Sequence, residues 1–157
     1  CIRDRALQAG PILLEDGRSP LNNAYLEAEE QFWSSRTLPD GRWQIGVVPT
    51  NYKTDVDHTR AGRAGLGIDS EGNLVLVMVA GVNDGMGVPG QDSFGATLTE
   101  LTDLLSAAGA RAAVNLDGGG STQAYYRGER MLVPGDRRGI PGQIYERLVP
   151  SVGVVIS

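Results

Sequence analysis

Apolar residues recur at helical spacing in one stretch of the chain. The repeat consists of Leu98, Leu101, Leu104, Leu105 and Ala108. Gly109 follows the last of them as a C-terminal stop. Thr97 and Glu100 have the spacing of a capping box, which accounts for Glu100 without a catalytic role. We therefore predict one well-defined helix, beginning near residue 98.

Most other apolar residues form short runs bounded by turn residues, as strands do. Residues 64–68 and 74–80 flank the turn Asp69–Asn73 and predict a hairpin. This turn carries carboxylates beside a glycine but lacks the ligand series of a calcium loop. The run 74–80 contains no polar residue, which is typical of a strand buried on both faces.

The rest of the chain gives weaker signals. We expect further strands at 6–14 (with a turn at 15–18), 43–48, 111–116, 122–126, 131–133 and 149–156, a modest helix at 22–33, and loops at 49–63, 81–95 and 134–142. Strands outnumber helices, so the predicted fold class is α+β with a mainly β core, in a single domain covering residues 1–157.

Composition narrows the classes of function. With 14 Lys and Arg against 19 Asp and Glu, the net charge of −5 argues against a nucleic-acid partner or a basic membrane-binding patch. The sequence contains no apolar run near the roughly 20 residues that span a bilayer. Glycine is about twice as frequent as usual, at 22 of 157 residues, which favours turns and close backbone approaches.

The strongest candidate for a functional site is the segment 115–122, with the sequence NLDGGGST. A strand here ends in an amide and a carboxylate, Asn115 and Asp117, followed by three glycines and two hydroxyls. Consecutive glycines can leave backbone N–H groups unshielded, as in anion-binding nests and oxyanion sites. Asp117 would be the acid, base or nucleophile. The predicted anion-binding residues are Gly118, Gly119, Gly120, Ser121 and Thr122.

Other candidates come from the polar loop 49–63. Arg63 and, less strongly, Arg60 would clamp a phosphate or carboxylate near the glycine turn. His58 is the only histidine and would serve as a general acid or base. One imidazole and one distant thiol do not make a zinc site, so we expect neither a metal nor a cofactor. Tyr125 and Tyr126 would pack on a strand, with stacking on a sugar as the alternative.

The single cysteine is residue 1 and cannot form an internal disulfide. Three interpretations stay open. The expressed segment simply begins there, or a precursor is cut before Cys1, or Cys1 carries a lipid anchor, which is the weakest of the three. The second interpretation would place an α-amine beside the thiol as base for an N-terminal nucleophile.

Five segments stand in an order that resembles the phosphodiester glycosidase family. They are 8–11 (QAGP), 63–69 (RAGLGID), 93–101 (SFGATLTEL), 115–122 (NLDGGGST) and 146–152 (ERLVPSV). The resemblance covers nearly the whole chain, and NLDGGGS is its most specific part. It implies a hydrolase that cleaves a sugar-1-phosphodiester, a small-molecule substrate, and a site lined by Asn115, Asp117, Ser121, Arg63 and the glycines. A carboxylate would assist loss of the sugar through an oxocarbenium-like transition state.

Two departures from the family pattern matter. Ala80-Gly81 stands where members commonly carry Asp-Gly, so one acidic group is absent. The family also carries a substantial segment before QAGP, so we expect this chain to be part of a two-chain protein processed from one precursor, or a reduced domain. The alternatives are an amidohydrolase or acyltransferase that uses Cys1, and a non-catalytic domain that binds sugar or phosphate. The resemblance to the family favours secretion of the protein, although a cytoplasmic location is also compatible with the sequence.

Overall fold

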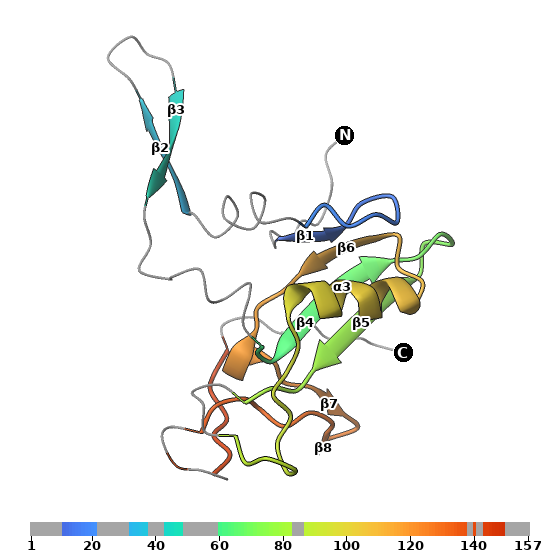
Figure 1. Cartoon of the computed structure of the whole chain (residues 1–157), viewed down its shortest axis with the longest axis vertical. Helices are drawn as coiled ribbons and strands as arrows, with labels where there is room; N and C mark the ends of the chain where they lie inside the picture. The colour runs from blue at the N-terminus through green and yellow to red at the C-terminus, as the bar shows by residue number, and fades with distance from the viewer. Residues whose placement is uncertain are drawn as a thin grey trace.

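The structure is a computed structural model that describes residues 11–21, 60–82, 87–137, 140 and 143–149, together with the backbone of 32–37 and 43–48. Its elements are β1 (Ile12–Leu14), β2 (Phe32–Thr37), β3 (Trp43–Val48), β4 (Arg63–Ile68), β5 (Leu74–Val79), α3 (Leu98–Ala107), β6 (Ala112–Asn115), a 3-10 turn (Gly119–Ser121), β7 (Tyr125–Tyr126) and β8 (Glu129–Arg130). Figure 1 shows their arrangement. Within these residues no helix is long and apolar enough to cross a membrane.

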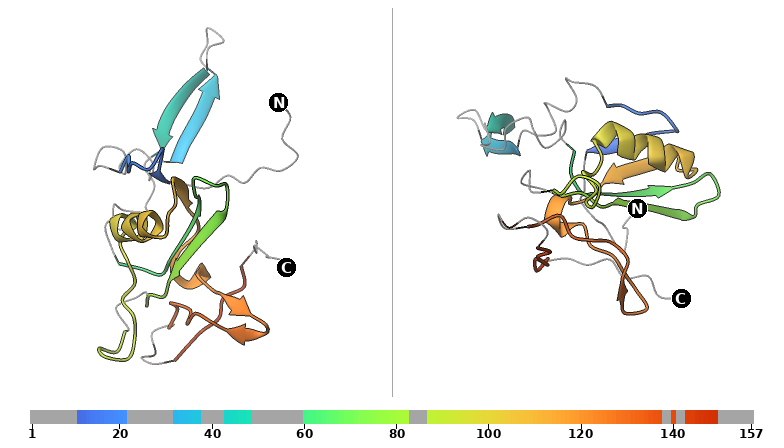
Figure 2. Two further views of the ribbon diagram at one scale, coloured as in Figure 1. Left: turned by 90° about the vertical axis from the view of Figure 1, so that its right-hand side faces the viewer. Right: turned by 60° about the horizontal axis from the view of Figure 1, so that its bottom comes forward.

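A four-stranded antiparallel sheet carries the core. Its strand order is β1-β6-β4-β5, and α3 lies across one face (Figures 1 and 2). Leu98, Leu101 and Leu105 of α3 are buried against β1 and β6. The helix approaches β4 closely because Gly65 has no side chain, and a Cβ there would lie 2.7 Å from Cδ1 of Leu105. The predicted α+β class with a mainly β core is confirmed.

Helix α3 begins and ends as its sequence predicts. Thr97 is the N-cap, its hydroxyl accepts the Glu100 N–H at 3.2 Å, and the Glu100 carboxylate accepts the Thr97 N–H at 3.0 Å. Gly109 follows the helix with φ +94°, a conformation that glycine adopts without a steric penalty. The apolar repeat and the capping box therefore placed this helix correctly.

The predicted hairpin is β4–β5, whose turn is held by Asp69. Its Oδ1 accepts the N–H groups of Glu71 and Asn73, both at 2.8 Å. The expectation that 74–80 is buried on both faces is wrong, because β5 is an edge strand whose outer residues Leu74 and Leu76 are 70% and 53% exposed. A run of apolar residues alone cannot distinguish a central strand from an edge strand that is covered on one face only.

The remaining predictions had mixed outcomes. The strand at 43–48 is β3, but Phe32 and Trp33 lie in β2, and no strand had been expected at 32–37. The pairing of β2 with β3 overrides the weak helical propensity of that segment. The strand expected at 122–126 is β7, shortened to Tyr125–Tyr126, but its partner is β8, and residues 131–133 are irregular. The expected helix over 22–31 and the final strand from residue 150 lie outside the described residues.

Candidate functional site

Strand β6 delivers the NLDGGGST segment to one end of the sheet. Asn115 is the last residue of β6, is partly buried, and pairs with Gly65 of β4. Asp117, two residues further on, is exposed, and its Oδ1 accepts the N–H of Gly118 at 2.8 Å. A carboxylate in contact with solvent therefore stands at the start of the glycine turn.

The glycine turn is folded on itself. The Gly119 N–H donates to the Gly62 carbonyl at 2.7 Å, while the N–H groups of Ser121 and Thr122 donate to the carbonyls of Gly118 and Gly119. Together with Gly118, four N–H groups expected to face an anion are thus bonded within the protein. Of these four, only Gly118 donates to a side chain, so rotation of Asp117 is enough to present it to a ligand.

The base of the turn is a contact between backbones. Gly62 lies so close to the turn that a Cβ there would be 2.8 Å from the Gly119 carbonyl oxygen. Gly81 and Gly95 meet the 61–62 segment from the other side, and a Cβ on either would fall deep inside van der Waals contact with its backbone. Bridges between Ala61 and Ala96 and between residues 81 and 94 close this junction. The loop 81–95 is thereby anchored beneath the predicted site.

Two of the five predicted binding residues in this turn face inward. Gly120 is buried and Thr122 is only 2% exposed, whereas Gly118, Gly119 and Ser121 are partly exposed. The turn therefore offers its first half and Ser121 to solvent, while its second half is part of the packed interior.

The two arginines expected to clamp an anion are engaged elsewhere. Arg63 is 3% exposed and its Nε donates to the Ala96 carbonyl at 3.2 Å, beneath Gly118. Arg60 bonds the Gly95 carbonyl at 3.0 Å and forms an ion pair with Glu100. The Thr97 N–H, followed by Arg60, lowers the pKa of the Glu100 carboxyl. Arg63 thus reaches the glycine turn, and Arg60 instead ties its loop to the start of α3.

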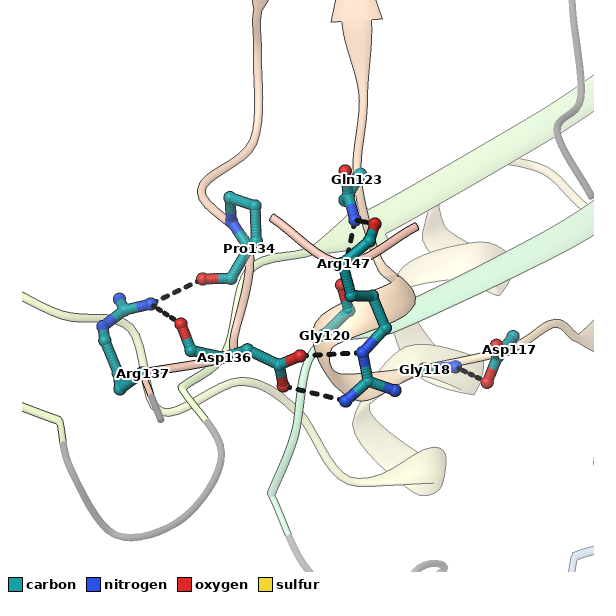
Figure 3. Close-up of polar contacts among 8 residues, drawn as sticks. All are labelled: Asp117, Gly118, Gly120, Gln123, Pro134, Asp136, Arg137 and Arg147. Atoms are coloured by element: carbon teal, nitrogen blue, oxygen red, sulfur yellow. Dashed lines mark hydrogen bonds and ion pairs between the residues drawn. The ribbon is translucent and has the colours of Figure 1, made fainter. Parts of the chain in front are cut away.

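A group of four charged residues that the sequence did not suggest lies near the turn, and Figure 3 draws three of them, Asp136, Arg137 and Arg147. Arg137, 1% exposed, donates to Asp92 Oδ1 at 2.7 Å and to the carbonyl of Pro134 at 2.6 Å. Arg147 binds both oxygens of Asp136, through Nε at 2.7 Å and Nη2 at 3.1 Å. The Asp136 carboxylate packs directly on Gly120, leaving no space for a Cβ there.

The sequence gives only a weak signal for these four charged residues. Asp136 and Arg137 fall in a segment that reads as a Pro/Gly-rich loop, and Arg147 lies in the ERLVPSV segment, to which the resemblance assigned no role. Their pairing joins residues 45 positions apart, as in Asp92–Arg137, and no local pattern encodes such a contact.

The adjacent tyrosines do not pack as expected. Tyr125 is 54% and Tyr126 60% exposed on the β7–β8 hairpin, so the packing interpretation is wrong. The Tyr125 hydroxyl donates to Glu146 at 2.9 Å, which raises the pKa of that tyrosine. The Arg127 guanidinium stands 5.2 Å from the centre of the Tyr126 ring. Two-residue strands simply have too little sheet to cover these rings.

Two candidates cannot be placed. Cys1 and His58 lie outside the described residues, so their roles stay predictions. Among the residues that are described, no three His, Cys, Asp or Glu side chains cluster as they would around a metal ion.

The fold is that of an α+β domain whose four-stranded sheet presents the NLDGGGST segment at one end. A family profile described as "Phosphodiester glycosidase" matches residues 3–156, and the chain belongs to that family. No curated protein sequence matches it significantly.

Two solved structures are similar. The catalytic domain of zebrafish N-acetylglucosamine-1-phosphodiester alpha-N-acetylglucosaminidase, auto-inhibited by its pro-peptide, superposes with a TM-score of 0.57 at 22% identity over 88% of this chain. A hypothetical protein from Synechocystis gives 0.50 at 25% identity over 80%. The chain spans only 38% and 18% of those two proteins, respectively.

Proposed function

We propose that the chain hydrolyses a sugar-1-phosphodiester, releasing free sugar and a phosphate monoester. The observation that carries this proposal is the position of Asp117, an exposed carboxylate where the NLDGGGST segment of a phosphodiester glycosidase leaves the sheet.

In this reaction the bond between the anomeric carbon and the phosphate oxygen breaks, and water supplies the new hydroxyl group of the sugar. Positive charge develops on the sugar ring in the transition state, and a carboxylate beside the ring stabilises it. Asp117 would fill this role. Its rotation away from Gly118 would also free one N–H for the departing phosphate.

The proposal is tested by incubating the 157-residue chain with alkyl phosphodiesters of hexose-1-phosphates and of N-acetylhexosamine-1-phosphates, and measuring the free sugar released. Asp117→Asn should lower kcat by about 10²- to 10⁴-fold, as loss of an acid–base or charge-stabilising group does. Asp103→Asn is the matched control, because Asp103 is an exposed carboxylate on α3. It should leave turnover unchanged.

The outcomes separate the candidate functions. A folded wild-type chain that turns over none of these diesters contradicts the proposal. If the same chain nevertheless binds the diesters, the non-catalytic binding domain becomes the better interpretation. If Asp117→Asn is as active as the wild type, hydrolysis occurs without the carboxylate to which we assign it.

A further inference from the structure

Arginine side chains often bind phosphate groups, and the arginines near the glycine turn differ sharply in their exposure. Arg63 and Arg137 are 3% and 1% exposed. Both bind groups inside the protein: Arg63 donates to the Ala96 carbonyl, and Arg137 pairs with Asp92. Arg60 is exposed, but it is held by Glu100 at the start of α3. Arg63 reaches the turn only from its buried side, beneath Gly118, and the other two arginines are bound to carboxylates.

Arg147 differs from them in position. Arg147 binds the Asp136 carboxylate, and this carboxylate packs against Gly120. The Asp136 carboxylate therefore links the Arg147 guanidinium to the turn. Gln123 adds a second link, because its Nε2 donates to the carbonyl of Gly120 at 3.2 Å and to that of Arg147 at 2.9 Å. Figure 3 draws the guanidinium with Asp136 on one side and the Asp117–Gly118 segment on the other.

The charges of this pair are ordered from the inside outward. The Asp136 side chain is 11% exposed, whereas that of Arg147 is 47% exposed. A ligand arriving from solvent therefore meets the guanidinium before the carboxylate. The bidentate contact occupies the Nε and Nη2 edge of Arg147 and fixes the plane of the guanidinium. Such fixing lowers the entropy that the side chain loses when it binds an anion.

We propose that Arg147 binds the phosphate group of the substrate and that Asp136 is the residue that positions it. This inference deepens the proposed function and rests on it for the identity of the substrate. Binding of a phosphate anion, however, is testable without any turnover.

The test measures binding of inorganic phosphate to the full chain by isothermal titration calorimetry. Arg147→Gln should weaken the phosphate Kd between about ten- and a hundred-fold, the loss expected for one charge-assisted contact. Arg147→Lys keeps the charge but loses the two-pronged guanidinium, so its phosphate Kd should lie between those of the wild type and Arg147→Gln. Arg130→Gln is the matched control, because Arg130 is an exposed arginine paired with a carboxylate, Glu146, at 2.8 Å. Its Kd should stay within about twofold of the wild-type value.

Removing Arg147 alone leaves the Asp136 carboxylate without this partner inside the protein, and that variant can fail to fold. The double variant Asp136→Asn/Arg147→Gln removes both charges and keeps amide groups that can bond each other. It should melt near the wild-type temperature and still bind phosphate as weakly as Arg147→Gln.

The outcomes distinguish failure of the Arg147 inference from failure of the proposed function. Undetectable phosphate binding by the wild type, or wild-type affinity in a folded variant lacking Arg147, overturns the inference. Turnover of a sugar-1-phosphodiester with an unchanged KM in Arg147→Gln also overturns it, while the proposed function stands. Phosphate binding that depends on Arg147, in a chain that hydrolyses no diester, supports the inference and refutes the function.

Discussion

Replacing Gly120 with alanine tests the contact that joins the glycine turn to the charges behind it. Gly120 is buried, and a Cβ there would overlap the Cγ and both oxygens of Asp136. The carboxylate cannot retreat freely, because Arg147 holds it through bonds of 2.7 and 3.1 Å. The added methyl must therefore displace the turn or break the ion pair.

The expected cost follows from that geometry. Overpacking of a well-filled site costs about 1–3 kcal/mol, and loss of good geometry at a charged pair places Gly120→Ala in the upper half of this range, at about 2–3 kcal/mol. For a chain of this length, about 2–4 °C per kcal/mol converts this cost to a fall in melting temperature of roughly 4–12 °C.

The assay is a double-mutant cycle followed by urea denaturation. Combined with Asp136→Ala, which removes the clashing atoms, Gly120→Ala should cost less than about 1 kcal/mol. Gly72→Ala is the control for backbone effects, since Gly72 has φ +88° and a Cβ added there would meet no other atom within 4 Å. Its cost should be the same in both backgrounds. A cost of Gly120→Ala that Asp136→Ala leaves unchanged would refute the reasoning.

Three further outcomes are expected. The pKa of Glu100 is lowered in the folded state, first by the Thr97 N–H and then by Arg60, so its contribution to stability is complete above the ordinary value of 4.5 and is lost as the pH falls through the lowered folded pKa. Urea midpoints of Glu100→Gln should therefore fall less than those of the wild type over that acid range. Leu105→Ala should destabilise the chain by about 2–5 kcal/mol in the same assay, because Leu105 is 0% exposed on the buried face of α3. Leu76→Thr should change the free energy of unfolding by no more than about 0.5 kcal/mol, and a larger loss would show that the outer face of β5 is covered.

Local patterns predicted those parts of the fold that local interactions stabilise. The α3 repeat, the Thr97 cap and the Asp69 turn each lie within a few residues of chain, and each is confirmed. The exposure of β5 could not be predicted, because it depends on where a strand stands in the sheet.

In the site, too, local features were predictable and contacts between distant segments were not. The segment 115–122 lies at the end of a strand, as predicted, and Asp117 is exposed there. The partner of the Gly119 N–H was not predictable, because Gly62 approaches the turn from 57 residues earlier in the chain. Likewise, Arg147 meets Asp136 only because the 143–149 segment returns beside the turn.

The junction of Gly62, Gly81 and Gly95 has a consequence for anyone who would redesign this domain. Three stretches of main chain touch there with no side chain between them. A saturation library should tolerate almost nothing at Gly81 or Gly95, since even alanine would force the backbone segments apart. Changes to ligand binding would therefore have to come from more exposed side chains near the turn, such as Ser121 or Tyr126, while the three glycines are kept.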